Sequence, residues 1–297
     1  MIGLGRMGGN MVLRLLRKQH RVIGFDRSED AVKGVQAQGA VGASSLEDVC
    51  KAFQSKPRVF WVMLPAGKPT SETIDRLTDL GEAGDIIIDG GNTNWQLAVQ
   101  DAARVKHKGL HYMDAGTSGG IWGNQYGYCL MVGGDDDVFA HCEPLLKALA
   151  PDDGGLVRTG PEGSGHFVKM VHNGIEYAMM QAYAEGFNLM KNSVYEGMDL
   201  HAIAEAWRSG SVVRSWLLDL IADGLSKDQD LSHLEPYVDD TGEGRWTVDT
   251  AIDCAIPTPV IAIALFERFR SRGQATYADK LLAMMRNQFG GHAVKTT

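Results

Sequence analysis

The chain has 297 residues, 44% of them hydrophobic and 22% charged, which suits a globular protein of one large or two ordinary domains. Its net charge of −8 leaves no basic excess to neutralise phosphates and argues against nucleic-acid binding. No apolar run approaches the ~20 residues of a membrane span, and glycines interrupt any signal peptide. The cysteines form no CxxC pair, so we expect reduced thiols, a cytoplasmic location and no metal site: Cys50, Cys129, Cys142 and Cys254.

The chain begins with a glycine-rich turn. Gly3, Gly5 and Gly8 satisfy the G-x-G-x-x-G pattern, and a helix is expected over about 6–19. Segment 21–26 then predicts a strand ending in an acid, roughly 20 residues after the first glycine, as in dinucleotide-binding units. The glycines there allow a tight turn, close approach of the backbone to the pyrophosphate, and close packing of helix on strand.

Only Met1 and Ile2 precede this motif, where a full buried strand is the usual arrangement. Either that strand is unusually short, or the start of the protein lies upstream. The sequence leaves both interpretations open.

The acid at the end of the second strand bears on the choice of cofactor. Asp26 would accept hydrogen bonds from ribose hydroxyls and would repel a 2′-phosphate, which favours NAD. Arg27 could instead bind that phosphate in NADP. We therefore expect NAD, with NADP as the less favoured alternative.

Strands and helices alternate over the first half of the chain. Apolar strands are predicted at 58–64, 85–89, 110–114 and 128–132, with helices at 70–80 and 95–108. This alternation predicts an α/β, Rossmann-type, doubly wound and mostly parallel sheet, in which ligands bind at the carboxyl ends of the strands. Three loops fall on that edge, although each could be an ordinary turn: Leu64-Pro-Ala-Gly67, Gly90-Gly-Asn92 and Ser118-Gly-Gly120.

Beyond about Gly160 helix follows helix, with no convincing strand. Segments 201–209, 213–225 and 259–270 carry apolar residues at helical spacing. We therefore expect a dinucleotide-binding domain at 1–160, followed at 161–297 by an all-helical domain for substrate binding and oligomerisation.

The most informative stretch is the helical segment 163–177. Plotted at about 100° per residue, five polar side chains share one face over two turns: Lys169, His172, Asn173, Glu176 and Tyr177. The opposite stripe is apolar and is expected to face the core: Phe167, Val171, Ile175 and Met179. A lysine and a glutamate two turns apart could hold a small molecule, although a solvated face is the simpler interpretation of a generic helix. The small residues Gly163-Ser-Gly165 favour close approach of a ligand or another backbone.

Together these motifs resemble 6-phosphogluconate dehydrogenase in its short bacterial form, over nearly the whole chain. The segments that carry the resemblance are Ile88-Asp-Gly-Gly-Asn92, Ser118-Gly-Gly120, 169–177 and Gly244-Arg-Trp-Thr247. The resemblance implies oxidative decarboxylation of 6-phosphogluconate to ribulose 5-phosphate and CO2, in the pentose phosphate pathway, with reduction of NAD or NADP. Short-form members often prefer NAD, in agreement with Asp26.

The resemblance also implies roles for individual residues. Lys169 matches the general base that takes the 3-hydroxyl proton as hydride leaves C3, and Glu176 matches the acid that protonates C1 after CO2 is lost. This chemistry needs a neutral lysine and a protonated glutamate. The family's substrate-contacting positions correspond here to Asn92, Ser118, Gly119, Gly120, His172, Asn173 and Tyr177. Cofactor contacts match Gly3, Leu4, Gly5, Arg6, Met7, Gly8, Asp26, Arg27, Leu64, Pro65, Ala66 and again Asn92.

The substrate's phosphate calls for cations. Arg268, in Phe266-Glu-Arg268, matches a phosphate-binding arginine of the family. Arg286 and His292 match a tail that reaches into the neighbouring subunit's site, which implies a homodimer or homotetramer with shared active sites. We expect this tail to lie beyond the last helix.

One loop departs from the family pattern. Thr241-Gly-Glu-Gly-Arg-Trp246 stands where the long form carries Lys-Gly-Thr-Gly-Lys-Trp, so a phosphate-contacting lysine becomes Thr241 and a threonine becomes Glu243. An acid beside a phosphate is unfavourable. We therefore expect this loop to bind differently, with Arg245 as its candidate cation.

Two other functions stay open at this point. β-Hydroxyacid dehydrogenases acting on 3-hydroxyisobutyrate or tartronate semialdehyde share the glycine motif, Ser-Gly-Gly and Lys-x-x-x-Asn, but they lack the glutamate and the Arg/His tail and do not decarboxylate. A nucleotide-sensing module would keep the fold without turnover. The intact Lys169 and Glu176 count against that module.

Overall fold

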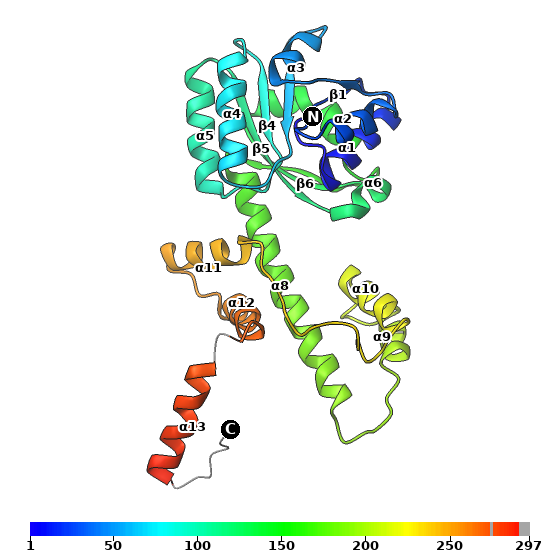
Figure 1. Ribbon diagram of the computed structural model, residues 1–297, viewed down its shortest axis with the longest axis vertical. Helices are drawn as coiled ribbons and strands as arrows, with labels where there is room; N and C mark the ends of the chain where they lie inside the picture. The colour runs from blue at the N-terminus through cyan, green and yellow to red at the C-terminus, as the bar shows by residue number, and fades with distance from the viewer. Residues whose placement is uncertain (274–275, 291–297) are drawn as a thin grey trace. The chain divides into compact units, whose positions relative to one another are not determined.

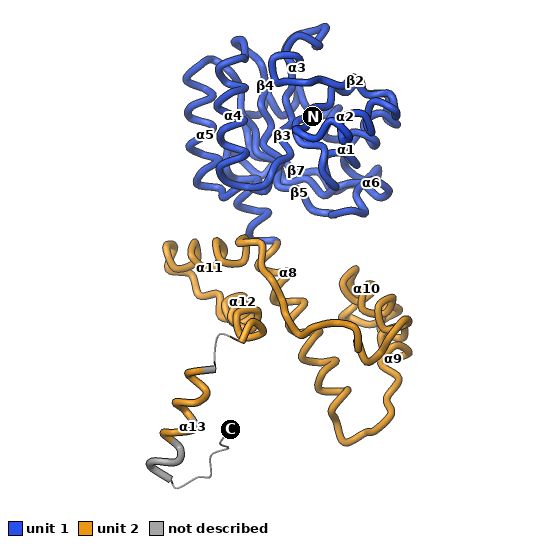
Figure 2. The backbone as a smooth tube through the Cα atoms, in the orientation of Figure 1, with its two compact units in different colours: residues 1–172 blue, residues 173–297 orange. Residues whose placement is uncertain are grey.

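The computed structural model describes residues 1–273 and 276–290, which divide into two compact units (Figure 2). The first unit, Met1–His172, is an α/β fold, and the second, Asn173–Thr297, consists of helices and loops in its described part. The predicted fold class is therefore confirmed. Among the described residues, no helix combines the length and the apolar character that crossing a membrane requires.

A five-stranded sheet lies at the centre of the first unit (Figure 1). Its order is β3 (Val59–Val62), β4 (Ile86–Asp89), β5 (His111–Ser118), β6 (Cys129–Gly133) and β7 (Leu156–Gly160). All neighbouring pairs are parallel except β5 and β6, as expected of a mostly parallel sheet. The sequence did not predict β7, because its residues are half-buried or exposed and carry no long apolar run.

The first residues of the chain act as a very short strand. Ile2 donates its N–H to the carbonyl of Trp61 at 2.8 Å, and its carbonyl accepts from Met63 at 2.7 Å. On the other side Gly3 donates to Phe25 at 2.9 Å. This segment thereby joins the main sheet to a parallel pair formed by β1 (Ile23–Gly24) and β2 (Val41–Gly42).

Helices cover both faces of the sheet, because alternate side chains of a strand point to opposite faces. Ile86 and Ile88 of β4 pack in a cluster with α1 (Arg6–Arg17) and α7 (Asp136–Leu149). Ile87, between them, packs in a second cluster with α4 (Lys68–Leu80) and α5 (Trp95–His107), which lie side by side in Figure 1. The remaining short helices of this unit are α2 (Glu29–Gln36), α3 (Leu46–Ala52), η1 (Gly120–Trp122) and α6 (Gly123–Tyr126).

Helix α8 (Ser164–Lys191) begins in the first unit and continues into the second. The second unit further contains α9 (Leu200–Arg208), α10 (Trp216–Leu225), α11 (Glu243–Asp253), α12 (Pro259–Ser271) and α13 (Thr276–Gly290). Helices α9 and α10 bury Leu200, Ala204, Leu218 and Ala222 against each other, at the helical spacing seen in the sequence.

A buried ion pair holds the entry to β3 beside the entry to β4. Arg58 and Asp85 are only 6% and 1% exposed, and the arginine Nε lies 2.9 Å from Oδ2 of the acid. The same carboxylate accepts the N–H of Glu82 at 2.8 Å. Burial works to raise the pKa of Asp85, but Arg58 and the backbone N–H groups hold it below its usual value.

We expect Asp85→Asn to lower the free energy of unfolding at pH 7 by about 3 kcal/mol, because it leaves the Arg58 charge buried without its counter-ion. The lowered pKa of Asp85 contributes stability at neutral pH that is lost as pH falls through that pKa, so the two proteins should converge in acid. Urea unfolding at several pH values measures this. Asp79→Asn is the control, since its carboxylate is 61% exposed and 3.8 Å from Lys108. If both variants lost the same free energy of unfolding, the buried pair of Arg58 and Asp85 would not have this stabilising role.

Candidate active site

The glycine-rich turn has the shape that a bound dinucleotide requires. Gly3 has φ +92°, and a Cβ there would lie 2.2 Å from the Met63 carbonyl oxygen. A Cβ on Gly8 would lie 2.0 Å from the carbonyl oxygen of Gly3, so helix and strand meet at van der Waals contact. Gly5 faces open space and caps α1 with no side-chain hydrogen bond. The first amides of α1 are thus positioned for an anion such as a pyrophosphate.

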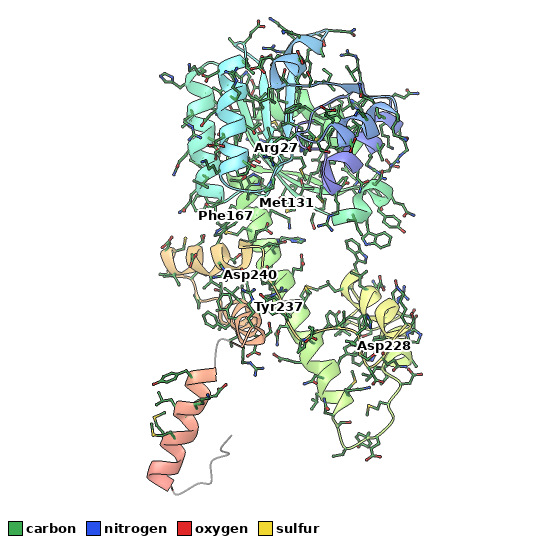
Figure 3. The ribbon with its side chains drawn as sticks, in the orientation of Figure 1. Arg27, Met131, Phe167, Asp228, Tyr237 and Asp240 are labelled. Atoms are coloured by element: carbon green, nitrogen blue, oxygen red, sulfur yellow. The ribbon has the colours of Figure 1, made fainter. Side chains whose placement is uncertain are left out.

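Asp26 is anchored to this turn. Its Oδ2 accepts the N–H of Leu4 at 2.7 Å, and its Oδ1 accepts the N–H of Ser28 at 2.8 Å. Arg27, labelled in Figure 3, is exposed beside it, as is Arg6, whereas Met7 is half-buried. The structure therefore brings the predicted acid and the predicted glycines together.

The three predicted loops lie next to one another at the carboxyl ends of β3, β4 and β5. A Cβ on Gly91 would lie 2.6 Å from the carbonyl oxygen of Leu64, so the first two loops touch. Asn92 accepts the N–H of Thr117 at 2.9 Å and donates to its carbonyl at 3.1 Å, which joins the second loop to the third. Pro65, Ala66, Ser118, Gly119 and Gly120 belong to the same edge.

A buried acid–histidine network beneath this edge was missed by sequence reasoning. Asp89 and Asp114 are fully buried in adjacent strands, and His166 is 1% exposed. Asp114 accepts the N–H groups of Gly163 at 2.6 Å and His166 at 2.7 Å, and so caps the first turn of α8. Asp89 Oδ2 lies 3.3 Å from Nε2 of the histidine, while Oδ1 accepts from Gly91 at 2.9 Å. The available signal was an acid directly after the apolar residues of each strand.

The pKa values of these two acids shift in opposite directions, although burial works to raise both. It works to raise the pKa of Asp89, but the charge and hydrogen bond of His166 hold that pKa below its usual value. Burial raises the pKa of Asp114 above its usual value, against the opposing effect of the same histidine. The network therefore ties the loop that carries Asn92 to the start of the helix that carries Lys169.

Lys169 is held close to the sheet by glycine. A Cβ on Gly116 of β5 would lie 2.4 Å from Cβ of Lys169 and 2.6 Å from the carbonyl oxygen of Gly165. The lysine is only 5% exposed. Close contact between strand and helix backbones thus positions and buries the amine-bearing side chain.

The burial of α8 is the reverse of the expected one. Lys169, Asn173 and Tyr177 are 5%, 8% and 5% exposed, whereas Phe167 and Ile175 of the apolar stripe are 37% and 50% exposed. Met179 is also exposed, and Val171, His172 and Glu176 are half-buried. The prediction of a core-facing apolar stripe is wrong, because Gly116 in the first unit and α11 in the second cover the polar face instead.

Arg268 lies beside the predicted substrate residues of the second unit. Its Cζ is 3.6 Å from the centre of the Tyr177 ring, and its Nη1 donates to the Asp239 carbonyl at 2.7 Å. Both side chains line a hollow of about 440 Å³, together with Gln181, Glu267 and Arg270.

The matched C-terminal residues are only partly described. Arg286 lies within α13, so the expectation that it follows the last helix is wrong, and its side chain lies outside the described residues. His292 lies outside the described residues altogether.

The segment that departs from the family pattern leads into α11, and its arginine is exposed but paired with an acid. Arg245 Nε lies 2.7 Å from Oδ2 of Asp240, and its Cζ is 4.4 Å from the centre of the Phe269 ring. Arg272 also donates to Asp240, at 2.6 Å. Hydrogen bonding from Arg245, with Arg272, holds the pKa of Asp240 well below its usual range against burial. Arg245 is therefore engaged by an acid of its own unit.

Comparison with known proteins covers both halves of the chain. A family model described as the NAD binding domain of 6-phosphogluconate dehydrogenase matches residues 1–160. The model for the C-terminal domain of the same enzyme matches residues 165–295. A putative 6-phosphogluconate dehydrogenase, YqeC of Bacillus subtilis, is 41% identical over 99% of this chain and 98% of its own length. An NAD(+)-dependent, decarboxylating 6-phosphogluconate dehydrogenase of Haloferax volcanii is 39% identical over 99% of this chain and 97% of its own length.

Longer relatives extend beyond this chain. The NAD(+)-dependent, decarboxylating 6-phosphogluconate dehydrogenase of Bacillus subtilis is 36% identical over 91% of this chain, and the match covers 60% of that enzyme. The solved 6-phosphogluconate dehydrogenase of Plasmodium falciparum superposes with a TM-score of 0.85 at 28% identity, covering 100% of this chain and 65% of that one. A Mycobacterium tuberculosis 3-hydroxyisobutyrate dehydrogenase, at 22% identity and a TM-score of 0.71, shows the shared fold alone. The predicted family is confirmed: this chain belongs to the 6-phosphogluconate dehydrogenase family.

Proposed function

We propose that this protein oxidises and decarboxylates 6-phosphogluconate with NAD, giving ribulose 5-phosphate, CO2 and NADH. The observation that carries the proposal is the buried lysine Lys169, seated on Gly116 of β5, with Glu176 two turns further along the same helix. This pair supplies a base and an acid on one face of α8. The reaction needs both groups.

The chemistry follows from these two side chains. Burial disfavours a charged amine, so it favours the neutral Lys169 that can take the 3-hydroxyl proton as hydride passes to the nicotinamide. The resulting β-keto acid loses CO2, and the protonated Lys169 returns its proton to the enolate oxygen, which gives an enediol. The half-buried Glu176 then donates a proton to the carbon that becomes C1 of the product, while the enediol hydroxyl gives its proton to the neutral Lys169 and becomes the ketone.

The remaining binding roles are part of the same proposal. NAD lies along the glycine-rich turn and the Leu64-Pro-Ala66 loop, with its ribose at Asp26. The sugar acid contacts Asn92, the Ser118-Gly-Gly120 loop and the polar face of α8. Arg268, in its 440 Å³ hollow beside Tyr177, binds the phosphate as a charge-assisted partner.

We also propose a homo-oligomer, in which Arg286 and His292 reach a neighbouring subunit. The support is the exposed apolar stripe of α8, where Ile175 is 50% exposed, since exposed apolar patches mark interaction surfaces. The free state of Cys129 and the other cysteines agrees with a cytoplasmic enzyme.

Lys169→Ala is expected to lower kcat for NADH formation from 6-phosphogluconate by about a hundredfold or more, the usual contribution of a positioned base. Titration calorimetry should show NAD binding unchanged. Lys191→Ala is the control, since this lysine lies on the same helix with its side chain 46% exposed. An unmodified protein that reduced NAD with 3-hydroxyisobutyrate but not with 6-phosphogluconate would refute the proposal.

Gly116→Ala tests the glycine beneath the lysine. Its new methyl group would lie 2.4 Å from Cβ of Lys169, so α8 must shift and kcat should fall about tenfold to a hundredfold. Gly186→Ala, on the same helix with nothing within 4 Å, should leave kcat unchanged. A normal kcat for Gly116→Ala in a folded protein would show that this contact does not position the base.

Asp26→Ser should raise the ratio of kcat/KM for NADP to that for NAD by about tenfold or more, because it removes the carboxylate that repels a 2′-phosphate. The absolute efficiency with NAD should fall as well, since the variant loses the bonds to Leu4 and Ser28. Asp30→Ser, at a carboxylate 97% exposed, is the control. If Asp26→Ser left the ratio of kcat/KM for NADP to that for NAD unchanged, Asp26 would not determine which cofactor is used.

A further inference from the structure

The first turn of α11 is bound to α8 through a buried acid. Glu243, the first residue of α11, is 7% exposed. Its carboxylate accepts one hydrogen bond from Nδ2 of Asn173 and a second, at 3.2 Å, from the hydroxyl of Thr241. Glu243, which is unfavourable beside a phosphate, therefore makes hydrogen bonds within the second unit instead.

The geometry around this acid is closely packed. The Tyr177 hydroxyl accepts the N–H of Thr241 at 3.2 Å, and a Cβ on Gly244 would lie 2.6 Å from the Tyr177 ring. One turn of α8 earlier, a Cβ on Gly174 would lie 2.8 Å from Thr247. These contacts leave α11 little freedom to slide on α8, so the oxygens of Glu243 are held at one position.

A carboxylate fixes the orientation of an amide that it meets. An ionised acid only accepts hydrogen bonds, so Asn173 must turn its NH2 group toward Glu243. The carbonyl oxygen of the same amide then points away from Glu243 and keeps its capacity to accept hydrogen bonds. A threonine at position 243 would end two bonds earlier along the side chain and could not make this contact in the same backbone geometry.

We propose that Glu243 is a positioning residue for substrate recognition, acting through Asn173. By holding the amide nitrogen, it presents the amide oxygen to a hydroxyl of the sugar acid. The inference rests on the proposed function and deepens it, because it assigns this loop to the hydroxylated part of the substrate. Arg245, two residues after Glu243 in α11, stays paired with Asp240.

A double-mutant cycle tests whether Glu243 acts through Asn173. Glu243→Ala should raise both KM and the calorimetric Kd for 6-phosphogluconate about tenfold, with KM for NAD unchanged. Asn173→Ala should raise them at least as much, and the double variant no more than Asn173→Ala alone. Glu243→Gln, which can still accept from the amide, should stay within about threefold of the unmodified protein. If Glu243→Ala does not fold, Glu243→Thr takes its place.

The control is Asp249→Ala, at an exposed acid of the same helix, which should change neither KM. The inference would be overturned if the KM increases of the two single variants multiplied in the double variant, or if Glu243→Ala lowered Tm without changing KM. Either result would leave the proposed function intact. An unmodified protein that neither binds nor oxidises 6-phosphogluconate would overturn both.

Discussion

The close approach of helix α8 to strand β5 is the constraint on which the rest of the first unit depends. Side chains would keep a helix and a strand apart, and only the missing Cβ atoms of Gly116 and Gly165 let these two backbones meet. A helix so close brings its own polar side chains into the interior, and its first amides must find acceptors there. The carboxylate of Asp114 accepts these N–H groups. The burial of this acid and the burial of Lys169 therefore both result from the close contact between α8 and β5.

Local patterns made much of this fold predictable. The glycine turn, the acid that follows β1 and the apolar strands β3 to β6 are each set by a few consecutive residues, and all were found. Strand β5 extends to Ser118, past the predicted end, because its small residues Ala-Gly-Thr-Ser have no apolar signature. The two faces of α8 were also found, but periodicity does not say which face is covered. That depends on β5 and α11, which are distant in sequence.

The partners of the acidic side chains were the least predictable part of the second unit. Arg272 and Asp240 lie 32 positions apart, and Asn173 and Glu243 lie 70 apart, so no local pattern links them. In the sequence alone, an arginine such as Arg245 resembles a ligand-binding group, because the acid that it pairs with is not evident. The structure shows that such groups can serve the packing of the unit, because a buried acid requires compensation wherever it occurs.

Asp26 has a consequence for protein engineering. One carboxylate closes the glycine turn, through Leu4 and Ser28, and in the proposed function it also faces the place where the two nicotinamide cofactors differ. On that proposal, the same two oxygen atoms hold the turn and select the cofactor. A redesign for the phosphorylated cofactor must replace the lost backbone acceptors as well as the charge, for instance with a neutral side chain of similar reach. An evolutionary change of preference between NAD and NADP would likewise have to keep acceptors for the two backbone N–H groups while changing the charge.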